Sequence, residues 1–179
     1  MQATSDASLR YIQKLQLFEG LKEREKSILA GVFKPRGLVA GEVLCREGDP
    51  ARSFFVIASG SIEIYKELAE GRREFLVTVG PNTILGQVSL IDRGARSATL
   101  KAASSTMVLE CGVDDFDRLF NAGTPFAYKL MDKIVTELAR GVREADQELF
   151  VLFSNPKKTL MRLHEAALDV QRAAVSRGT

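Results

Sequence analysis

Residues 34–111 carry glycine at short intervals, and this spacing limits the segment to short strands joined by turns. Glycines at positions 37, 41, 48, 60, 71, 80 and 86 divide the segment into short stretches. Between them, apolar and polar side chains alternate, as at Phe75, Val77 and Val79, which is the period of a β-strand. Many short strands with regular turns are typical of a compact antiparallel barrel or roll. The stretch SFFVIASGSIEIYKE at 53–67 has an apolar run, a Ser-Gly turn and renewed alternation, and it predicts a β-hairpin.

Helical periodicity flanks this segment on both sides. The chain up to about residue 33 has helical spacing, 114–120 predicts a short helix with an acidic first turn, and about 126–153 predicts a long helix. We therefore predict an α+β fold, an antiparallel, jelly-roll-like β-roll of about eight strands flanked by N-terminal helices and a long C-terminal helix. The predicted parts are 1–33 (helices), 34–112 (the roll), 113–153 (short and long helix) and 154–179 (a helical tail that begins at Asn155 and Pro156).

Apolar residues in the long helix recur at intervals of three and four. This heptad spacing predicts a homodimer through the helix, although an apolar stripe also suits packing against the roll. The predicted dimer seam consists of Val135, Leu138, Val142, Ala145, Leu149 and Leu152.

The single histidine of the chain, His164, limits the enzyme chemistry that the sequence supports. Small metal-dependent barrels use several histidines, and serine or cysteine nucleophiles need one beside them. His164 stands on the predicted tail, far in sequence from Cys45 and Cys111. The carboxylates Glu47 and Asp49, in the stretch REGDPA, are interpreted as a turn rather than as an acid–base pair. We therefore predict no enzymatic activity, no metal site and no covalent cofactor.

The bulk composition names no macromolecular partner. The formal net charge is +2, which is far from that of a nucleic-acid polycation. The N-terminus lacks the apolar stretch of a signal peptide, and no apolar run is long enough to span a bilayer. Two cysteines without metal-ligand spacing suit a reducing compartment. These features predict a cytoplasmic protein that is not embedded in a membrane.

The stretch ILGQVSLIDRGARSATL at 84–100 combines two features that suit a phosphate group. Gly86 lets the backbone approach a ligand closely, and the helical turn that follows offers unpaired amides. Arg96 can pair with the oxygens of an anion, and Ser97 adds a hydroxyl beside it. As a loop residue, Arg96 is expected to be exposed. Taken alone, this pattern also fits a purely structural loop.

Three stretches together resemble the cyclic nucleotide-binding domain family: LFEGL, LVAGEVLCREGDPARSFFVIASGSIEIYK and VTVGPNTILGQVSLIDRGARSATLKA. The resemblance covers about residues 15–150 and implies an eight-stranded β-roll with a phosphate-binding cassette, here 84–97. Gly86 matches the cassette glycine whose amide faces the ligand, Arg96 the phosphate-binding arginine and Ser97 the residue after it. Val88 and Leu90 would line or support the apolar side of the pocket. The long helix matches the C-helix of the family, which covers the base and, in catabolite-activator-type proteins, dimerises.

The sequence departs from the family pattern at two places. The usual glutamate that accepts a hydrogen bond from the ribose 2′-hydroxyl is Gln87, whose carbonyl can still accept that bond without charge assistance. Where activator-type members offer Thr-Ser to adenine, this chain has Ala145 and Asp146. Recognition of the base is therefore expected from Arg140 or Arg143.

The resemblance implies a regulatory module that binds a cyclic nucleotide, cyclic AMP (cAMP) rather than cyclic GMP (cGMP), and signals through its C-helix to an effector protein that the sequence does not identify. The alternative is a degenerate fold that acts as a dimeric scaffold without nucleotide. DNA binding is not expected, because the segment after Asn155 resembles only the first helix of the helix-turn-helix that activator-type members add.

Overall fold

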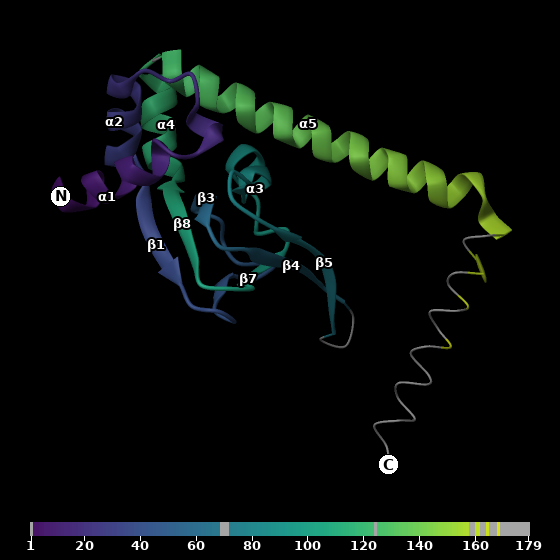
Figure 1. Ribbon diagram of the computed structural model, residues 1–179. Coiled ribbons are helices and arrows are strands. Elements are labelled where there is room, and N and C mark those ends of the chain that lie inside the picture. The colour runs from purple at the N-terminus through teal and green to yellow at the C-terminus, as the bar shows by residue number, and fades with distance from the viewer. Residues whose placement is uncertain are drawn as a thin grey trace. The chain divides into compact units, whose positions relative to one another are not determined.

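The computed structural model describes residues 2–68, 72–123, 125–157, 160–161, 164 and 168. The chain divides into two compact units, residues 1–135 and 136–179, and each is described by itself. Within the described residues, the first unit contains two four-stranded sheets (Figure 1). The strands of one sheet lie in the order β1 (Lys34–Leu38), β8 (Thr106–Gly112), β3 (Ser53–Ser59) and β6 (Ile84–Leu85). Those of the other lie in the order β2 (Val43–Cys45), β7 (Thr99–Ala102), β4 (Ile62–Glu67) and β5 (Arg73–Val79).

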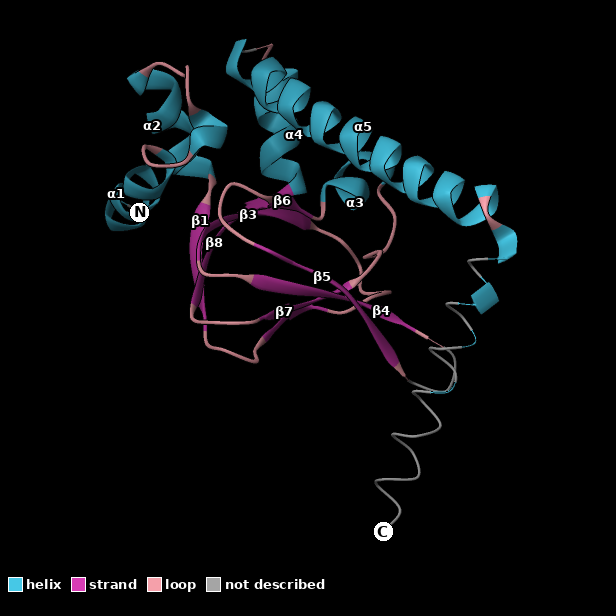
Figure 2. Cartoon of the chain, turned by 45° about the vertical axis from the view of Figure 1, so that its right-hand side comes forward, coloured by secondary structure: helices cyan, strands magenta, loops and turns pink. Residues whose placement is uncertain are grey.

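All neighbouring strands in both sheets run antiparallel, which confirms the predicted β-roll. The helices are α1 (Gln2–Ile12), the 3-10 helix η1 (Gln16–Phe18), α2 (Glu23–Val32), α3 (Gln87–Asp92), α4 (Val113–Asn121) and α5 (Pro125–Ser154). Helices α1, α2 and α4 lie at one end of the sheets, as Figures 1 and 2 both show. The predicted short and long helices are confirmed as α4 and α5.

The second unit comprises the rest of α5 and the tail. Of the predicted tail helix, the structure describes only scattered residues, and most of its apolar positions lie outside the described residues. His164 is helical and exposed. The division of the chain at residues 33, 112 and 153 stays a prediction.

The hairpin predicted over 53–67 is wrong, because β3 and β4 belong to different sheets. Strand β3 pairs with β8 and β6, whereas β4 pairs with β5 and β7. The first five residues of β3 are all buried, so this strand needs neighbours on both sides and cover on both faces. The turn at Gly60 therefore carries the chain from one sheet to the other, and the β-hairpin of this region is β4–β5.

Strand β3 supplies side chains to two separate apolar layers. Phe55 lies in the cluster that fills the space within the roll, and the buried members of this cluster are Leu38, Leu44, Phe55, Ile57, Ile62, Leu85, Leu100, Ala102 and Val108. Its neighbour Phe54 faces the helices, since successive residues of a strand point to opposite faces. Phe54 packs edge to face against Phe33 of the N-terminal helices at 5.6 Å and against Phe116 of α4 at 5.7 Å. Strand β3 thus connects the roll interior with the helical end.

Gly60 offers a test of the crossing between the sheets. Its φ of +82° is left-handed, and a Cβ atom there would lie 2.4 Å from the backbone oxygen of Ser105. Because backbone cannot yield as a flexible side chain does, we expect Gly60→Ala to lower the free energy of unfolding in urea by about 2–4 kcal/mol. Gly41→Ala is the matched control, since Gly41 has a φ of +85° but no atom within 4 Å of the added Cβ. The control should lose only about 1 kcal/mol, and equal losses would contradict a packed crossing.

Candidate functional site

The predicted cassette forms a short helix bounded by two left-handed residues. Gly86 precedes α3 with a φ of +77°, and Arg93 ends it with a φ of +58°. The Leu90 amide donates to the Gly86 carbonyl at 3.2 Å, which closes the first turn. The amides before Leu90 have no partner four residues back in the helix, so they are available to a ligand. The helical turn expected after Gly86 is therefore present.

Arg96 is buried, with 6% of its surface exposed, so the expectation of an exposed loop arginine is wrong. The reason lies in the backbone. The Arg96 amide donates to the Asp49 carbonyl at 2.9 Å, and the Gly48 amide donates to the Arg96 carbonyl at 2.9 Å. These two bonds fix Arg96 against the turn at 46–49, and its side chain extends into the roll.

The turn that holds Arg96 is itself built by the two carboxylates of REGDPA. Asp49 Oδ2 accepts a hydrogen bond from the Arg46 amide at 2.8 Å. Glu47 accepts bonds from Lys66 Nζ and from the Glu67 amide, each at 2.8 Å. The bond from Lys66 is the main cause that lowers the pKa of the Glu47 carboxyl. Both carboxylates are thus engaged in the structure of the turn, as the sequence predicted.

Two residues that the sequence did not single out contact the Arg96 guanidinium, and a third binds one of them. Its Nη2 donates to Ser53 Oγ at 3.2 Å, and its Cζ lies 5.0 Å from the centre of the Phe55 ring. Ser53 Oγ in turn donates to Glu110 Oε1 at 2.7 Å. No local motif marks these positions, because the hydrogen bonds of Ser53 join it to residues 43 and 57 positions away along the chain, and Phe55 is similarly distant from Arg96.

The other terminal nitrogen of Arg96, Nη1, is buried and has no hydrogen-bond partner among the described residues. It lies against Gly86, where an added Cβ atom would be 2.3 Å from it. The partners of the guanidinium described above, a hydroxyl and an aromatic ring, carry no negative charge. A buried cation that lacks an opposite charge is costly, and a buried donor without an acceptor adds to the cost. The site therefore suits an anion that reaches Nη1 beside Gly86.

The remaining cassette residues differ in exposure. Gln87 is half-buried at the start of α3, Val88 is 43% exposed, and Leu90 is buried. Ser97 is exposed, and its carbonyl accepts a bond from Lys66 Nζ at 2.8 Å. The chain thus brings Gly86, Gln87, Val88, Arg96 and Ser97 into one loop–helix–loop segment.

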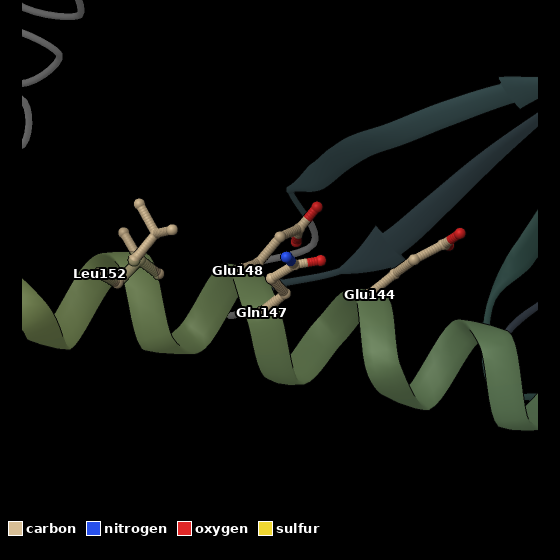
Figure 3. Close-up of a pocket in the computed structure, with 5 residues that line it drawn as sticks. Glu144, Gln147, Glu148 and Leu152 are labelled. Atoms are coloured by element: carbon tan, nitrogen blue, oxygen red, sulfur yellow. The ribbon is translucent and has the colours of Figure 1, made fainter.

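Arg140 and Arg143 lie on α5 in the second unit, so their predicted contact with the base stays a prediction. Arg140 forms ion pairs with Glu137 and Glu144 of its own helix. A hollow along α5 is lined by Glu144, Gln147, Glu148, Val151 and Leu152, and Figure 3 shows the polar side chains of this set. Its two carboxylates repel a phosphate, so this hollow is not suited to a nucleotide.

Among the described residues, no cluster of His, Cys, Asp and Glu has the composition of a metal site. No described helix combines the length and the apolar character that crossing a membrane requires. The thiols of Cys45 and Cys111 are free, and burial is the main cause that raises the pKa of the Cys111 thiol to about 12.

Comparison with known proteins agrees with this geometry. The profile of the family described as "Cyclic nucleotide-binding domain" matches residues 35–122. A cyclic nucleotide-binding-like protein from Brucella abortus is 31% identical with a TM-score of 0.53, and the match covers 65% of this chain and 99% of that one. The chain belongs to the cyclic nucleotide-binding domain family.

Two longer relatives are also similar to this chain. The Cyclic AMP receptor protein of Thermus thermophilus is 31% identical over 136 residues, which is 76% of this chain and 61% of that protein. The crystal structure of the Thermus thermophilus Catabolite Activator Protein has a TM-score of 0.67 at 29% identity, and the match covers 76% of this chain and 62% of that one. The chain thus spans about three fifths of the length of these relatives.

The unpaired Nη1 leads to a prediction in which stability and binding change in opposite directions. Arg96→Met removes the buried charge and keeps most of the apolar volume. Without ligand, the variant should therefore be more stable than the wild type, with a free energy of unfolding that is higher by about 1–4 kcal/mol. Calorimetric titration with cAMP should show loss of binding. Arg118→Met is the control, because the Arg118 side chain lies outside the cassette, is 77% exposed, and forms an ion pair with Asp115 that contributes little. A less stable Arg96→Met variant would mean that the contacts of Arg96 outweigh its desolvation.

Proposed function

We propose that the chain binds a cyclic nucleotide in its 84–97 cassette, cAMP in preference to cGMP. The observation that carries this proposal is the buried, unpaired Nη1 of Arg96 beside Gly86. A cyclic phosphate brings one negative charge and oxygens that accept hydrogen bonds, which are the two things that this nitrogen lacks. The similarity to the Cyclic AMP receptor protein of Thermus thermophilus and to a cAMP-dependent protein kinase regulatory subunit from Emericella nidulans supports cAMP as the nucleotide.

Each cassette residue has a distinct task in this proposal. Arg96 neutralises the phosphate, and the amides that follow Gly86 donate to its oxygens. Ser97 adds a hydroxyl at the same side, and Gln87 accepts the hydrogen bond of the ribose 2′-hydroxyl. Arg140 or Arg143 contacts the base.

The bound nucleotide signals through the helices that follow the roll. The cassette helix is joined to α4, since Arg93 Nη2 lies 2.7 Å from Asp117 Oδ1. Helix α4 is joined to the start of α5, since the rings of Phe120 and Tyr128 pack edge to face at 5.4 Å. When the nucleotide orders the cassette, these contacts can therefore transmit the change to the start of α5. The changed position of α5 then alters the surface that an effector protein binds. The protein acts by binding, without catalysis, in the cytoplasm.

The exposed apolar residues of α5 support a homodimer through this helix. Val135, Val142 and Leu149 are apolar and are 52%, 69% and 52% exposed. Among the described side chains of α5, the buried ones are Ala127, Leu130 and Ile134, all near the start of the helix. A second copy of the helix would remove the exposed stripe from water.

Titration of the purified chain with cAMP, cGMP and 5′-AMP tests the proposed function. We expect saturable heat with cAMP, weaker binding of cGMP, and no comparable binding of 5′-AMP, whose open phosphate has a different shape and charge. The second candidate, a scaffold without nucleotide, is favoured only by Gln87 in place of the usual glutamate. Absence of heat and of a thermal shift at millimolar cAMP would contradict the proposed binding and favour that candidate.

Gln87→Glu restores a charged acceptor for the ribose hydroxyl. We expect the variant to bind cAMP more tightly by about 1 kcal/mol, since a charge-assisted bond replaces a neutral one. Because the gain depends on that hydroxyl, 2′-deoxy-cAMP should bind both proteins equally. Weaker binding of cAMP by Gln87→Glu would contradict the assignment of Gln87 to the ribose.

Leu149→Glu tests the dimer seam. The substitution would place two like charges opposite each other across a two-fold axis, so we expect a folded monomer by light scattering where the wild type is a dimer. Glu148→Gln, one position away on the same helix, is the control and should stay dimeric. A wild type that is monomeric at tens of micromolar would contradict the proposed dimer.

A further inference from the structure

Ser53 stands between the phosphate-binding arginine and a carboxylate. It is the first residue of β3 and is 8% exposed. Its Oγ lies 3.2 Å from Arg96 Nη2 and 2.7 Å from Glu110 Oε1. The three side chains are thus connected by hydrogen bonds from β8 through β3 to the cassette.

The chemistry of the three groups fixes the direction of both hydrogen bonds. A carboxylate only accepts and a guanidinium only donates, so the single Ser53 proton goes to Glu110 and the Ser53 lone pairs face Arg96. Glu110 thereby prevents the hydroxyl from rotating its proton toward the guanidinium. The charged acceptor also polarises the hydroxyl, which strengthens its bond with Arg96.

Strand pairing holds these groups in place. Glu110 on β8 is the register partner of Phe55 on β3, and Ser53 lies two residues before Phe55 on the same face. Phe55 packs against the guanidinium while Ser53 bonds to it, so two residues of one rigid strand define its position. The second oxygen of Glu110, Oε2, lies 4.0 Å from Arg36 Nη1, which leaves Oε1 to Ser53.

We propose that Ser53 and Glu110 are positioning residues for Arg96: they occupy Nη2 and thereby leave Nη1 as the nitrogen that meets the ligand phosphate. This inference rests on the proposed function. In it, the arginine is held in its binding orientation before the nucleotide arrives, so little side-chain ordering remains to be done on binding.

The first measurement needs no nucleotide. Arginine side-chain NMR of the ligand-free full chain should show a restrained Arg96 guanidinium with distinct Nη signals, and Ser53→Ala should average them. Ser53→Thr, which keeps the hydroxyl, should preserve them, and so should Arg36→Gln, which removes only the weaker partner of Glu110. Unchanged Arg96 signals in Ser53→Ala would overturn the inference, whether or not a nucleotide binds.

The second measurement uses cAMP and its two phosphorothioate diastereomers, which replace one or the other exocyclic oxygen with sulfur. Ser53→Ala and Glu110→Leu should each weaken cAMP binding about tenfold and reduce the preference between the diastereomers, because Arg96 is no longer directed at one particular exocyclic oxygen. Ser53→Thr, which keeps the hydroxyl, should retain both the affinity and the preference. Wild-type affinity and preference in both variants would overturn the inference. A loss of binding that parallels a loss of thermal stability, and that is no smaller in Ser53→Thr, would also overturn it.

The two measurements separate this inference from the proposed function. If the wild type binds no nucleotide while its Arg96 signals respond to Ser53→Ala, the proposed function fails and the positioning of Arg96 stands.

Discussion

The Arg96 guanidinium is buried, and one of its nitrogens has no hydrogen-bond acceptor among the described residues. The arrangement of the other residues of the site depends on this constraint. Burial of Arg96 requires residues that hold its backbone and residues that support its side chain. Both sets of residues come from distant parts of the chain. The turn at 46–49 binds the backbone, while Ser53 and Phe55 contact the side chain. Within the part of the chain that the structure describes, the positive charge of the guanidinium remains uncompensated at Nη1 beside Gly86. In the proposed function, an anionic ligand compensates it there.

The roll makes this arrangement possible because β3 is a central strand with two different faces. Phe55 and Ser53 face the arginine, and Phe54 faces the helices, where it packs against Phe33 and Phe116. A displacement of the guanidinium therefore acts on a strand that is also in contact with α4. Coupling between binding and the helices needs such an element in contact with both, and β3 meets that description within the first unit.

The sequence predicts the fold class because alternation and glycine spacing are local signals, and it also predicts the helical turn after Gly86. Prediction from the sequence fails where a residue's structural neighbours are far away along the chain. The 53–67 segment has the local pattern of a hairpin, but the burial of β3 on both faces places β4 in the other sheet. Burial of Arg96 could not be predicted either, since it depends on bonds to the 46–49 turn, and Ser53 and Glu110 carry no motif.

The most direct test of this account is a crystal structure of the chain with cAMP. The account predicts a phosphate oxygen within hydrogen-bond distance of Arg96 Nη1, at about 2.7–3.0 Å, with the phosphate against Gly86 and with the bond from Nη2 to Ser53 retained. A nucleotide bound away from Gly86, or an Arg96 side chain that leaves Ser53 and turns toward solvent when cAMP is present, would contradict it.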